Sequence, residues 1–109
     1  MAVYVKSEVG GTPSDVNADG KADLIWRNLS NGKVAVWLMD GTTIQSAGIP
    51  GGAPLVWQIV DVQDTNGDGK ADLIWRHDDG RVAVWLMDGT ALKSAGIPGA
   101  APLVWEIQP

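Results

Sequence analysis

Residues 15–27 read Asp-Val-Asn-Ala-Asp-Gly-Lys-Ala-Asp-Leu-Ile-Trp-Arg, and residues 64–76 repeat them as Asp-Thr-Asn-Gly-Asp-Gly-Lys-Ala-Asp-Leu-Ile-Trp-Arg, 49 residues later. A second block, residues 33–59, recurs at 81–107 with six differences among its 27 positions. Between the two blocks the second copy is one residue shorter, which indicates a surface turn. The chain of 109 residues is therefore built from two copies of one unit.

Each unit predicts several short strands separated by turns. In the first unit, residues 24–27, 34–39, 43–47 and 55–62 are apolar or alternating stretches typical of strands. Asp40-Gly41 is a turn dipeptide, and we expect Gly48-Ile49-Pro50-Gly51 to separate the third strand from the fourth, because Pro cannot donate to a ladder. Four strands in about 50 residues is the size of one propeller blade. We therefore predict an all-β fold, a β-propeller with two four-stranded blades per chain.

The loop before the second strand of each unit has the composition of a metal site. Its pattern, Asp-x-Asn-x-Asp-Gly-x-x-Asp, places oxygen side chains at positions 1, 3, 5 and 9, a Gly at position 6 for the turn, and a main-chain carbonyl at position 7. Ca²⁺ prefers such a flexible set of oxygen ligands. We predict about one Ca²⁺ per unit. The expected ligands are Asp15, Asn17, Asp19, the Lys21 carbonyl and Asp23, and then Asp64, Asn66, Asp68, the Lys70 carbonyl and Asp72.

Two alternatives accompany the calcium prediction. The loop is not a complete EF-hand, because position 12 is Trp26 or Trp75 rather than a Glu. An Asx-rich turn without any metal has the same residues. Two faithful copies favour the metal site, and we expect its role to be structural, since three carboxylates brought together without a cation repel one another.

Composition excludes several classes of function. The net charge of −5 argues against nucleic acid, which is bound by clustered Lys and Arg. The chain has no Cys, no apolar stretch of membrane-spanning length, and no signal peptide in residues 1–4. We expect no enzymatic activity, because no nucleophile–base pair is present and the single histidine, His77, is Asn28 in the other unit.

The motif Asp-x-Asn-x-Asp-Gly-Lys-Ala-Asp-Leu-Ile-Trp-Arg, followed by Val-Ala-Val-Trp-Leu-Met-Asp-Gly, resembles the FG-GAP/VCBS repeat over residues 15–107. The repeat is similar to those of the integrin α-subunit propeller and of certain fungal propeller lectins. This resemblance implies an extracellular or secreted protein that holds Ca²⁺ at the matching Asp positions.

The resemblance also suggests how the chain is divided. We expect an N-terminal segment at 1–14, a first blade at 15–62 with its calcium loop at 15–23, and a second blade at 63–109 with its calcium loop at 64–72. At the offset of 49 residues, Glu8 and Gly10 are the counterparts of Trp57 and Ile59, which precede the second aspartate loop. They are not an aromatic and an aliphatic residue, so the first blade is expected to lack its opening strand.

Two blades leave apolar outer faces and open edges, and a propeller has about four to eight blades. We expect the chain to associate with itself into a cyclic homo-oligomer, most simply a trimer or tetramer. The surplus residues 105–107 match the missing opening strand, and we expect them to complete the first blade of a neighbouring chain.

Three functions fit these features. The first is a lectin-like propeller that binds a carbohydrate or glycoprotein through stacking Trp residues and nearby polar groups. Its candidate ligand-binding residues are Trp26, Arg27, Asn28, Trp75, Arg76 and His77. The second is a designed or amplified self-assembling scaffold with no ligand beyond calcium. The third is a dockerin-like calcium module, which strands after the loop disfavour because a dockerin places a helix there.

Overall fold

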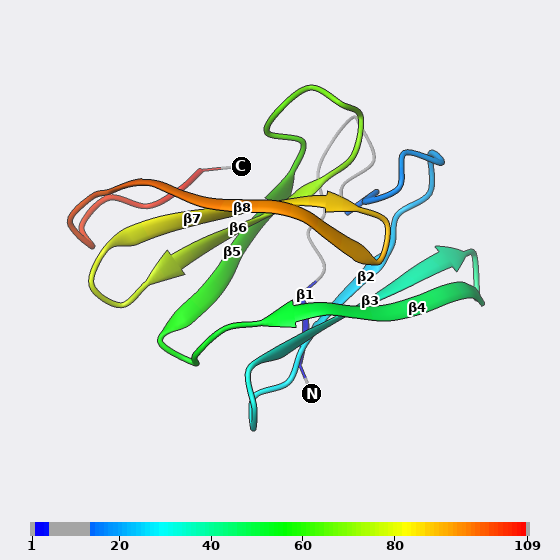
Figure 1. The fold of residues 1–109 in the computed structure, drawn as a ribbon, viewed down its shortest axis with the longest axis horizontal. Helices are drawn as coiled ribbons and strands as arrows, with labels where there is room; N and C mark the ends of the chain where they lie inside the picture. The colour runs from blue at the N-terminus through cyan, green and yellow to red at the C-terminus, as the bar shows by residue number, and fades with distance from the viewer. Residues whose placement is uncertain (1, 5–13, 109) are drawn as a thin grey trace.

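The computed structural model describes residues 2–4 and 14–108, and their regular structure is entirely β-sheet (Figure 1). The strands form two antiparallel four-stranded sheets, each ordered along the chain. The first sheet contains β1 (Ala2–Tyr4), β2 (Leu24–Arg27), β3 (Lys33–Asp40) and β4 (Thr43–Gly52). The second sheet contains β5 (Trp57–Gln63), β6 (Asp72–His77), β7 (Arg81–Asp88) and β8 (Ala91–Ala100). Within the described residues there is no helix long and apolar enough to cross a membrane.

The two sheets are built on the same register, which confirms the repeat at the level of structure. Ile25 pairs with Val36 in the first sheet, and Ile74 pairs with Val84 in the second. Residues 24–27 and 34–39 lie in strands as predicted, and β3 lies between β2 and β4. The all-β fold and the four strands per unit are therefore confirmed, whereas two sheets alone do not form a closed ring.

The prediction that residues 48–51 interrupt the sheet is wrong. Strand β4 runs through them to Gly52 and pairs with β3 on both sides of the proposed break. The register shifts between Val34 and Val36, which leaves Ile49 and Pro50 without partners in the ladder. Pro50 is tolerated because it lies in this bulge on an edge strand, where its missing N–H costs no ladder bond.

The strand expected to end the first blade opens the second sheet instead. Residues 57–63 form β5, which pairs with β6, so the boundary between sheets lies at residues 53–56 rather than at 62–63. The sequence repeat begins at the aspartate loop, but each sheet begins one strand earlier. The unit of sequence and the unit of structure are therefore offset by one strand.

The prediction that the first blade lacks an opening strand is also wrong. Ala2–Tyr4 pairs with β2, with Val3 opposite Trp26, where the second sheet has Ile59 opposite Trp75. Residues 8–10, on which that prediction rested, lie outside the described residues. The opening strand was missed because the first unit has 11 residues between Val3 and Asp15 where the second has four between Ile59 and Asp64, so a fixed offset does not align them.

The hydrophobic core lies between the two sheets. Ile25, Val34 and Val36 of the first sheet have no exposed surface, and Trp75 of the second sheet is only 1% exposed. The sheets approach closely along β4 and β8. At Gly48 of β4, an added Cβ would lie against the side chain of Thr90, in the turn before β8. Burying one such aliphatic side chain stabilises the fold by about 1.5–3 kcal/mol, so the pairing of sheets is a principal source of stability.

Candidate calcium-binding loops

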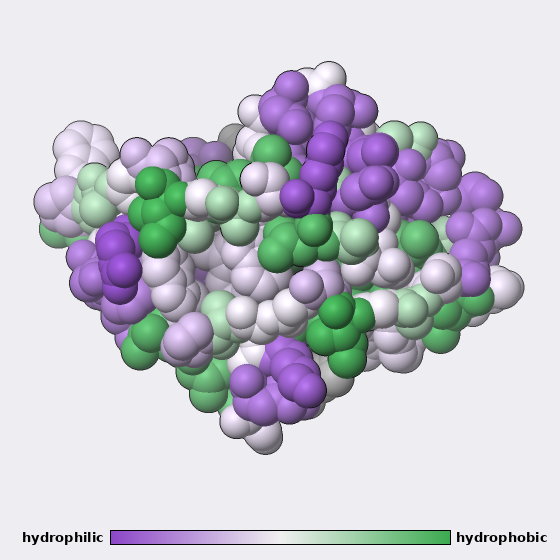
Figure 2. Space-filling view, in the orientation of Figure 1, coloured by the Kyte–Doolittle hydropathy of each residue, from purple (hydrophilic) through white to green (hydrophobic). Residues whose placement is uncertain are grey.

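Both aspartate loops lie on the same side of the molecule. The first loop, residues 14–23, leads into β2, and the second loop, residues 64–72, joins β5 to β6 (Figure 1). In the space-filling view, hydrophilic side chains gather over the part of the surface where Figure 1 places these loops (Figure 2). The loops therefore form one continuous polar region beside the apolar sheets.

Each loop brings three carboxylates together. One oxygen from each of Asp15, Asp19 and Asp23 lies within 4.8 Å of the others, and Asp64, Asp68 and Asp72 form the same arrangement. Asp23 and Asp72 are buried at the floor of each loop, whereas Asp19 and Asp68 are exposed at its rim. The cluster is thus open to solvent on one side and anchored in the protein on the other.

The first Asp of each loop is fixed by the loop's own main chain. Asp15 accepts hydrogen bonds from the N–H of Asp19 (3.2 Å) and Gly20 (2.8 Å). Asp64 accepts from the N–H of Gly67 and Gly69, both at 2.8 Å. These bonds hold the pKa of Asp64 below its usual value, the bond from Gly69 being the largest cause. The carboxylates are therefore oriented before any ligand arrives.

The last Asp of each loop ties the loop to the sheet. Asp23 accepts from the N–H of Met39 (2.9 Å) at the end of β3 and from that of Val16 (3.1 Å). Asp72 accepts from Met87 in the same way, at 2.9 Å. Burial raises the pKa of Asp23, and the charges of Asp19 and Asp15 add to the rise. At neutral pH, burial and the neighbouring charges therefore make ionisation of Asp23 unfavourable, and a bound cation would offset this free-energy cost.

The side-chain amide of each loop Asn lies between two carboxylates. One atom of the Asn17 amide lies 3.0 Å from Asp15 Oδ1 and 3.1 Å from Asp19 Oδ1, and Asn66 repeats this arrangement with Asp64 and Asp68. With its nitrogen at this position, the amide donates to both carboxylates, and the loop satisfies itself without metal. With its oxygen there, the amide joins the carboxylates as a ligand for a cation. The donor set fits a hard divalent cation.

The Lys residues at position 7 have a second contact that the sequence did not reveal. The Lys21 ammonium lies 3.4 Å from Asp40, and the Lys70 ammonium lies 3.0 Å from Asp88, each at the end of the third strand of its sheet. From the sequence, Asp40-Gly41 predicts only a turn. The signal for the contact with Lys21 is that both copies have the same Asp-Gly pair, although a turn alone does not require the same residues twice.

The two loops also contact each other across the sheets. The Ala71 N–H donates to the carbonyl oxygen of Asp15, and the Gly89 N–H donates to that of Val16, both at 2.8 Å. The first loop is therefore part of the interface between the sheets. Order in this loop and packing of the second sheet depend on each other.

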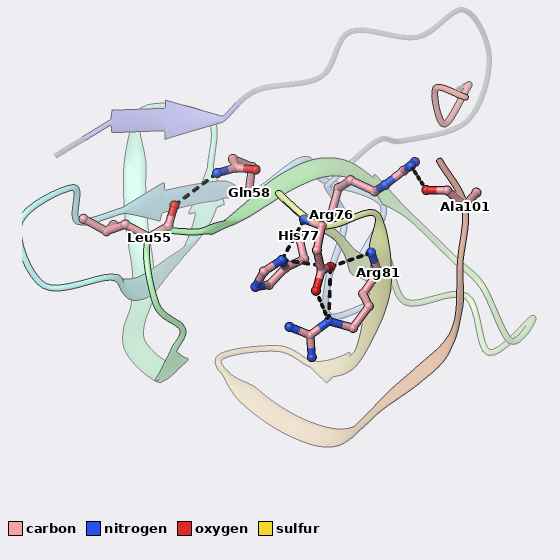
Figure 3. Close-up of polar contacts among 7 residues, drawn as sticks. Leu55, Gln58, Arg76, His77, Arg81 and Ala101 are labelled. Atoms are coloured by element: carbon pink, nitrogen blue, oxygen red, sulfur yellow. Dashed lines mark hydrogen bonds and ion pairs between the residues drawn. The ribbon is translucent and has the colours of Figure 1, made fainter. Parts of the chain in front are cut away.

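The two arginines proposed as ligand-binding residues lie inside the protein. Arg27 is 8% exposed and donates to the carbonyl oxygens of Gly32, Ala53, Pro54 and Trp57. Arg76 is 9% exposed and donates to Ala101, Pro102 and Trp105 in the C-terminal segment (Figure 3). Each guanidinium holds in place the segment that follows its own sheet, which is a structural role.

The other four candidates lie in turns or are packed on neighbouring rings. Asn28 caps its turn by accepting from the N–H of Ser30 (2.8 Å). His77, labelled in Figure 3, accepts from the Asp79 N–H. Its ring packs edge-on against Trp57, with ring centroids 4.7 Å apart. Trp26 and Trp75 lie against Trp37 and Trp85, at 4.8 Å in both cases. None of these four forms part of the acidic clusters.

An apolar hollow of about 410 Å³ lies between the sheets. Its lining residues are Ala53, Trp57, Trp75, Ala83, Trp85, Ala95, Gly96 and Ile97. The buried indole N–H of Trp75 has no hydrogen-bond partner among the described residues. The hollow therefore offers aromatic surface, whereas the Trp75 N–H is itself buried.

The repeated sheet with an aspartate loop before its second strand defines a class of β-repeat proteins with acidic loops. The FG-GAP-like repeat family model matches residues 15–75, more than half of the chain, and the chain belongs to this family. No curated protein and no solved structure matches the chain.

Proposed function

We propose that the chain is a calcium-stabilised binding and scaffolding module, with one Ca²⁺ in each aspartate loop. The observation that carries the proposal is the occurrence of the same acidic triad twice, with its oxygens within 4.8 Å of one another. The side-chain amides of Asn17 and Asn66, which lie against two carboxylates of these triads and can present an oxygen there, support it. Residues Asp15, Asn17, Asp19 and Asp23 would hold the first ion, and Asp64, Asn66, Asp68 and Asp72 the second, with the Lys21 and Lys70 carbonyls completing the sets.

The calcium in this proposal is structural. Each loop is tied to its sheet through the last Asp, so binding lowers the repulsion among carboxylates and fixes the end of β3 or β7. Extracellular calcium is abundant enough for modules of moderate affinity, and the family resemblance supports a secreted location. As a scaffold, the chain would complete a closed propeller by homo-oligomerisation, as a trimer or tetramer.

Isothermal titration of the metal-free chain with CaCl₂ tests the calcium sites. We expect about two ions per chain, one per loop. Asp19→Asn and Asp68→Asn alter exposed rim carboxylates, so each variant should fold and should weaken one site at least about ten-fold. Asp40→Asn is the matched control, because Asp40 pairs with Lys21 beside the first loop but lies outside the triad. Unchanged binding in Asp19→Asn, or no binding by the parent chain, would refute the proposal.

Carbohydrate binding is a second candidate function, favoured by the hollow lined by Trp57, Trp75 and Trp85. Aromatic faces stack on sugar rings, and the partly exposed Trp57 and Trp85 supply such faces. Arg27 and Arg76 are occupied by main-chain carbonyls, so the hollow supports this candidate better than the arginines do. A glycan array with the calcium-loaded chain tests it, with Trp57→Ala as the variant expected to lose the signal. A silent array would leave the scaffold function alone.

A further inference from the structure

We propose that a second copy of this chain docks head to tail on the second sheet, and that the C-terminal segment, residues 101–108, adds to strand β2 of that copy. This inference rests on the proposed scaffold function and identifies its partner and its contact surfaces. It follows from three features: the opposite burial of equivalent faces, main-chain groups of exposed residues in the loops, and an arginine that binds the C-terminal segment.

Equivalent residues of the two sheets are buried on opposite faces. The face of the first sheet that meets the second is fully buried, while the same face of the second sheet is partly exposed. The buried members are Ile25, Val34 and Val36, and their partly exposed counterparts are Ile74, Val82 and Val84. Strands β2–β4 and β6–β8 have nearly the same sequence, so the difference arises because, among the described residues, only the first sheet has a neighbour on this side.

The other face has the opposite pattern. On the second sheet it is buried at Trp75 and Ala83, whereas its counterparts on the first sheet, Trp26 and Ala35, are partly exposed. The two free faces of the chain are thus copies of the two faces that already pack together inside it. A second copy placed on the second sheet would repeat the internal interface with the same residues, which is a heterologous contact that extends until a ring closes.

The loops repeat the same relationship. Inside the chain, the Asp15 and Val16 carbonyls accept from the Ala71 and Gly89 N–H groups. The counterparts of the acceptors are the carbonyls of Asp64 and Thr65, both exposed residues. The counterparts of the donors are Ala22 and Gly41, also exposed, and a Cβ added to Gly41 would meet nothing within 4 Å. Because Asp64 belongs to a calcium loop, docking should depend on Ca²⁺.

The C-terminal segment is held as the opening strand of a further sheet. Arg76 donates to the carbonyls of Ala101, Pro102 and Trp105, as Arg27 donates to those of Ala53, Pro54 and Trp57. After this arginine contact, residues 57–59 enter β5 and pair with β6. Trp57 packs there on His77 and Arg81, whereas Trp105 is 68% exposed. The register of β5 would place Ile107 opposite Trp26 of the second copy.

That position is occupied in the single chain by β1, since Val3 lies opposite Trp26. The C-terminal segment of one chain and the N-terminal strand of the next therefore compete for one edge. We infer that Ala2–Tyr4 protects this edge in the isolated chain and is displaced on assembly. The longer apolar segment 103–107, with Trp105 as its anchor, should win this competition once the sheet faces are also in contact.

Light scattering coupled to size-exclusion chromatography, with the full chain in Ca²⁺ at high micromolar concentration, tests the inference. We expect a discrete trimer or tetramer that dissociates in EGTA. Val84→Asp places a charge on the free face and should give a monomer, because its counterpart Val36 is fully buried. Ala91→Asp is the matched control on the same sheet, since its counterpart Thr43 stays exposed beside the second sheet. This variant should assemble like the parent chain.

Trp105→Ala alters an exposed side chain and should fold normally while weakening assembly at least ten-fold. A Trp105→Ala variant that assembles like the parent would overturn the strand addition, and assembly by Val84→Asp would overturn the docking surface. Calcium titration of the same samples separates the two proposals. A monomer that binds two Ca²⁺ would overturn this inference alone, whereas a chain that binds no calcium would overturn the proposed function.

Discussion

The Arg27 guanidinium donates from Nη1 to the carbonyl oxygen of Trp57 at 2.9 Å, and so links β2 of the first sheet to the first residue of the second. The same group lies over the Trp75 ring, 4.6 Å from its centroid. One side chain therefore joins the end of one sheet, the linker and the core of the next. Burial lowers the pKa of Arg27, but the residue stays charged at any accessible pH.

Arg27→Ala should lower the free energy of unfolding by about 2–4 kcal/mol, because four main-chain carbonyls lose a donor and a cation–π contact is removed. Chemical denaturation followed by Trp fluorescence measures the loss. Arg76→Ala is the matched control: it releases only residues 101–105, which belong to no sheet in the single chain, and should cost less than half as much in the monomer. Equal losses would contradict a bridging role for Arg27.

Position 4 of the aspartate loop has a left-handed backbone in both copies but not the same residue. Ala18 has φ of 62°, and Gly67 has φ of 78°. The left-handed conformation costs a residue with a side chain about 1–2 kcal/mol of conformational free energy, whereas it costs Gly almost none. Ala18→Gly should therefore raise the free energy of unfolding by up to about 1 kcal/mol, and Gly67→Ala should lower it by about as much. Thermal unfolding without calcium measures both, and the same sign in both variants would refute this explanation.

Calcium should raise the melting temperature of the chain. Each ion present at 100 times its dissociation constant adds about 2.7 kcal/mol to the free energy of unfolding, because it binds only the folded loop. For a domain of this size that corresponds to a rise on the order of 10 °C per site. Scanning calorimetry with CaCl₂ or EGTA measures the shift, and MgCl₂ at the same concentration is the control. Equal stabilisation by both salts would contradict a site suited to Ca²⁺.

The repeat made most of the fold predictable. Residues 24–27 and 34–39 could be assigned as strands because an apolar run lies next to a recognisable turn in both copies, and the structure places them there. The opening strand could not be found by alignment at one offset, because seven more residues precede the first aspartate loop than the second. Sequence identity therefore located the strands within the repeat and missed the strand outside it.

The acidic clusters were predictable, and the positions of the arginines were not. Asp15, Asp19 and Asp23 converge because the loop is short and turns at Gly20, which has φ of 83°. Arg27 follows Trp26 at the end of a strand, where a side chain can point to solvent or toward the linker, and the sequence does not distinguish these directions. The deciding feature is the set of main-chain carbonyls at residues 53–57 that accept from Arg27, and only the fold brings them next to this side chain.

Native mass spectrometry of the full chain, in calcium and after EGTA, tests the central claim most directly, because it counts bound ions on each chain. The account predicts two Ca²⁺ per chain, one per aspartate loop, both removed by EGTA. A chain that retains its bare mass in excess calcium would contradict it and would reduce the two loops to metal-free turns.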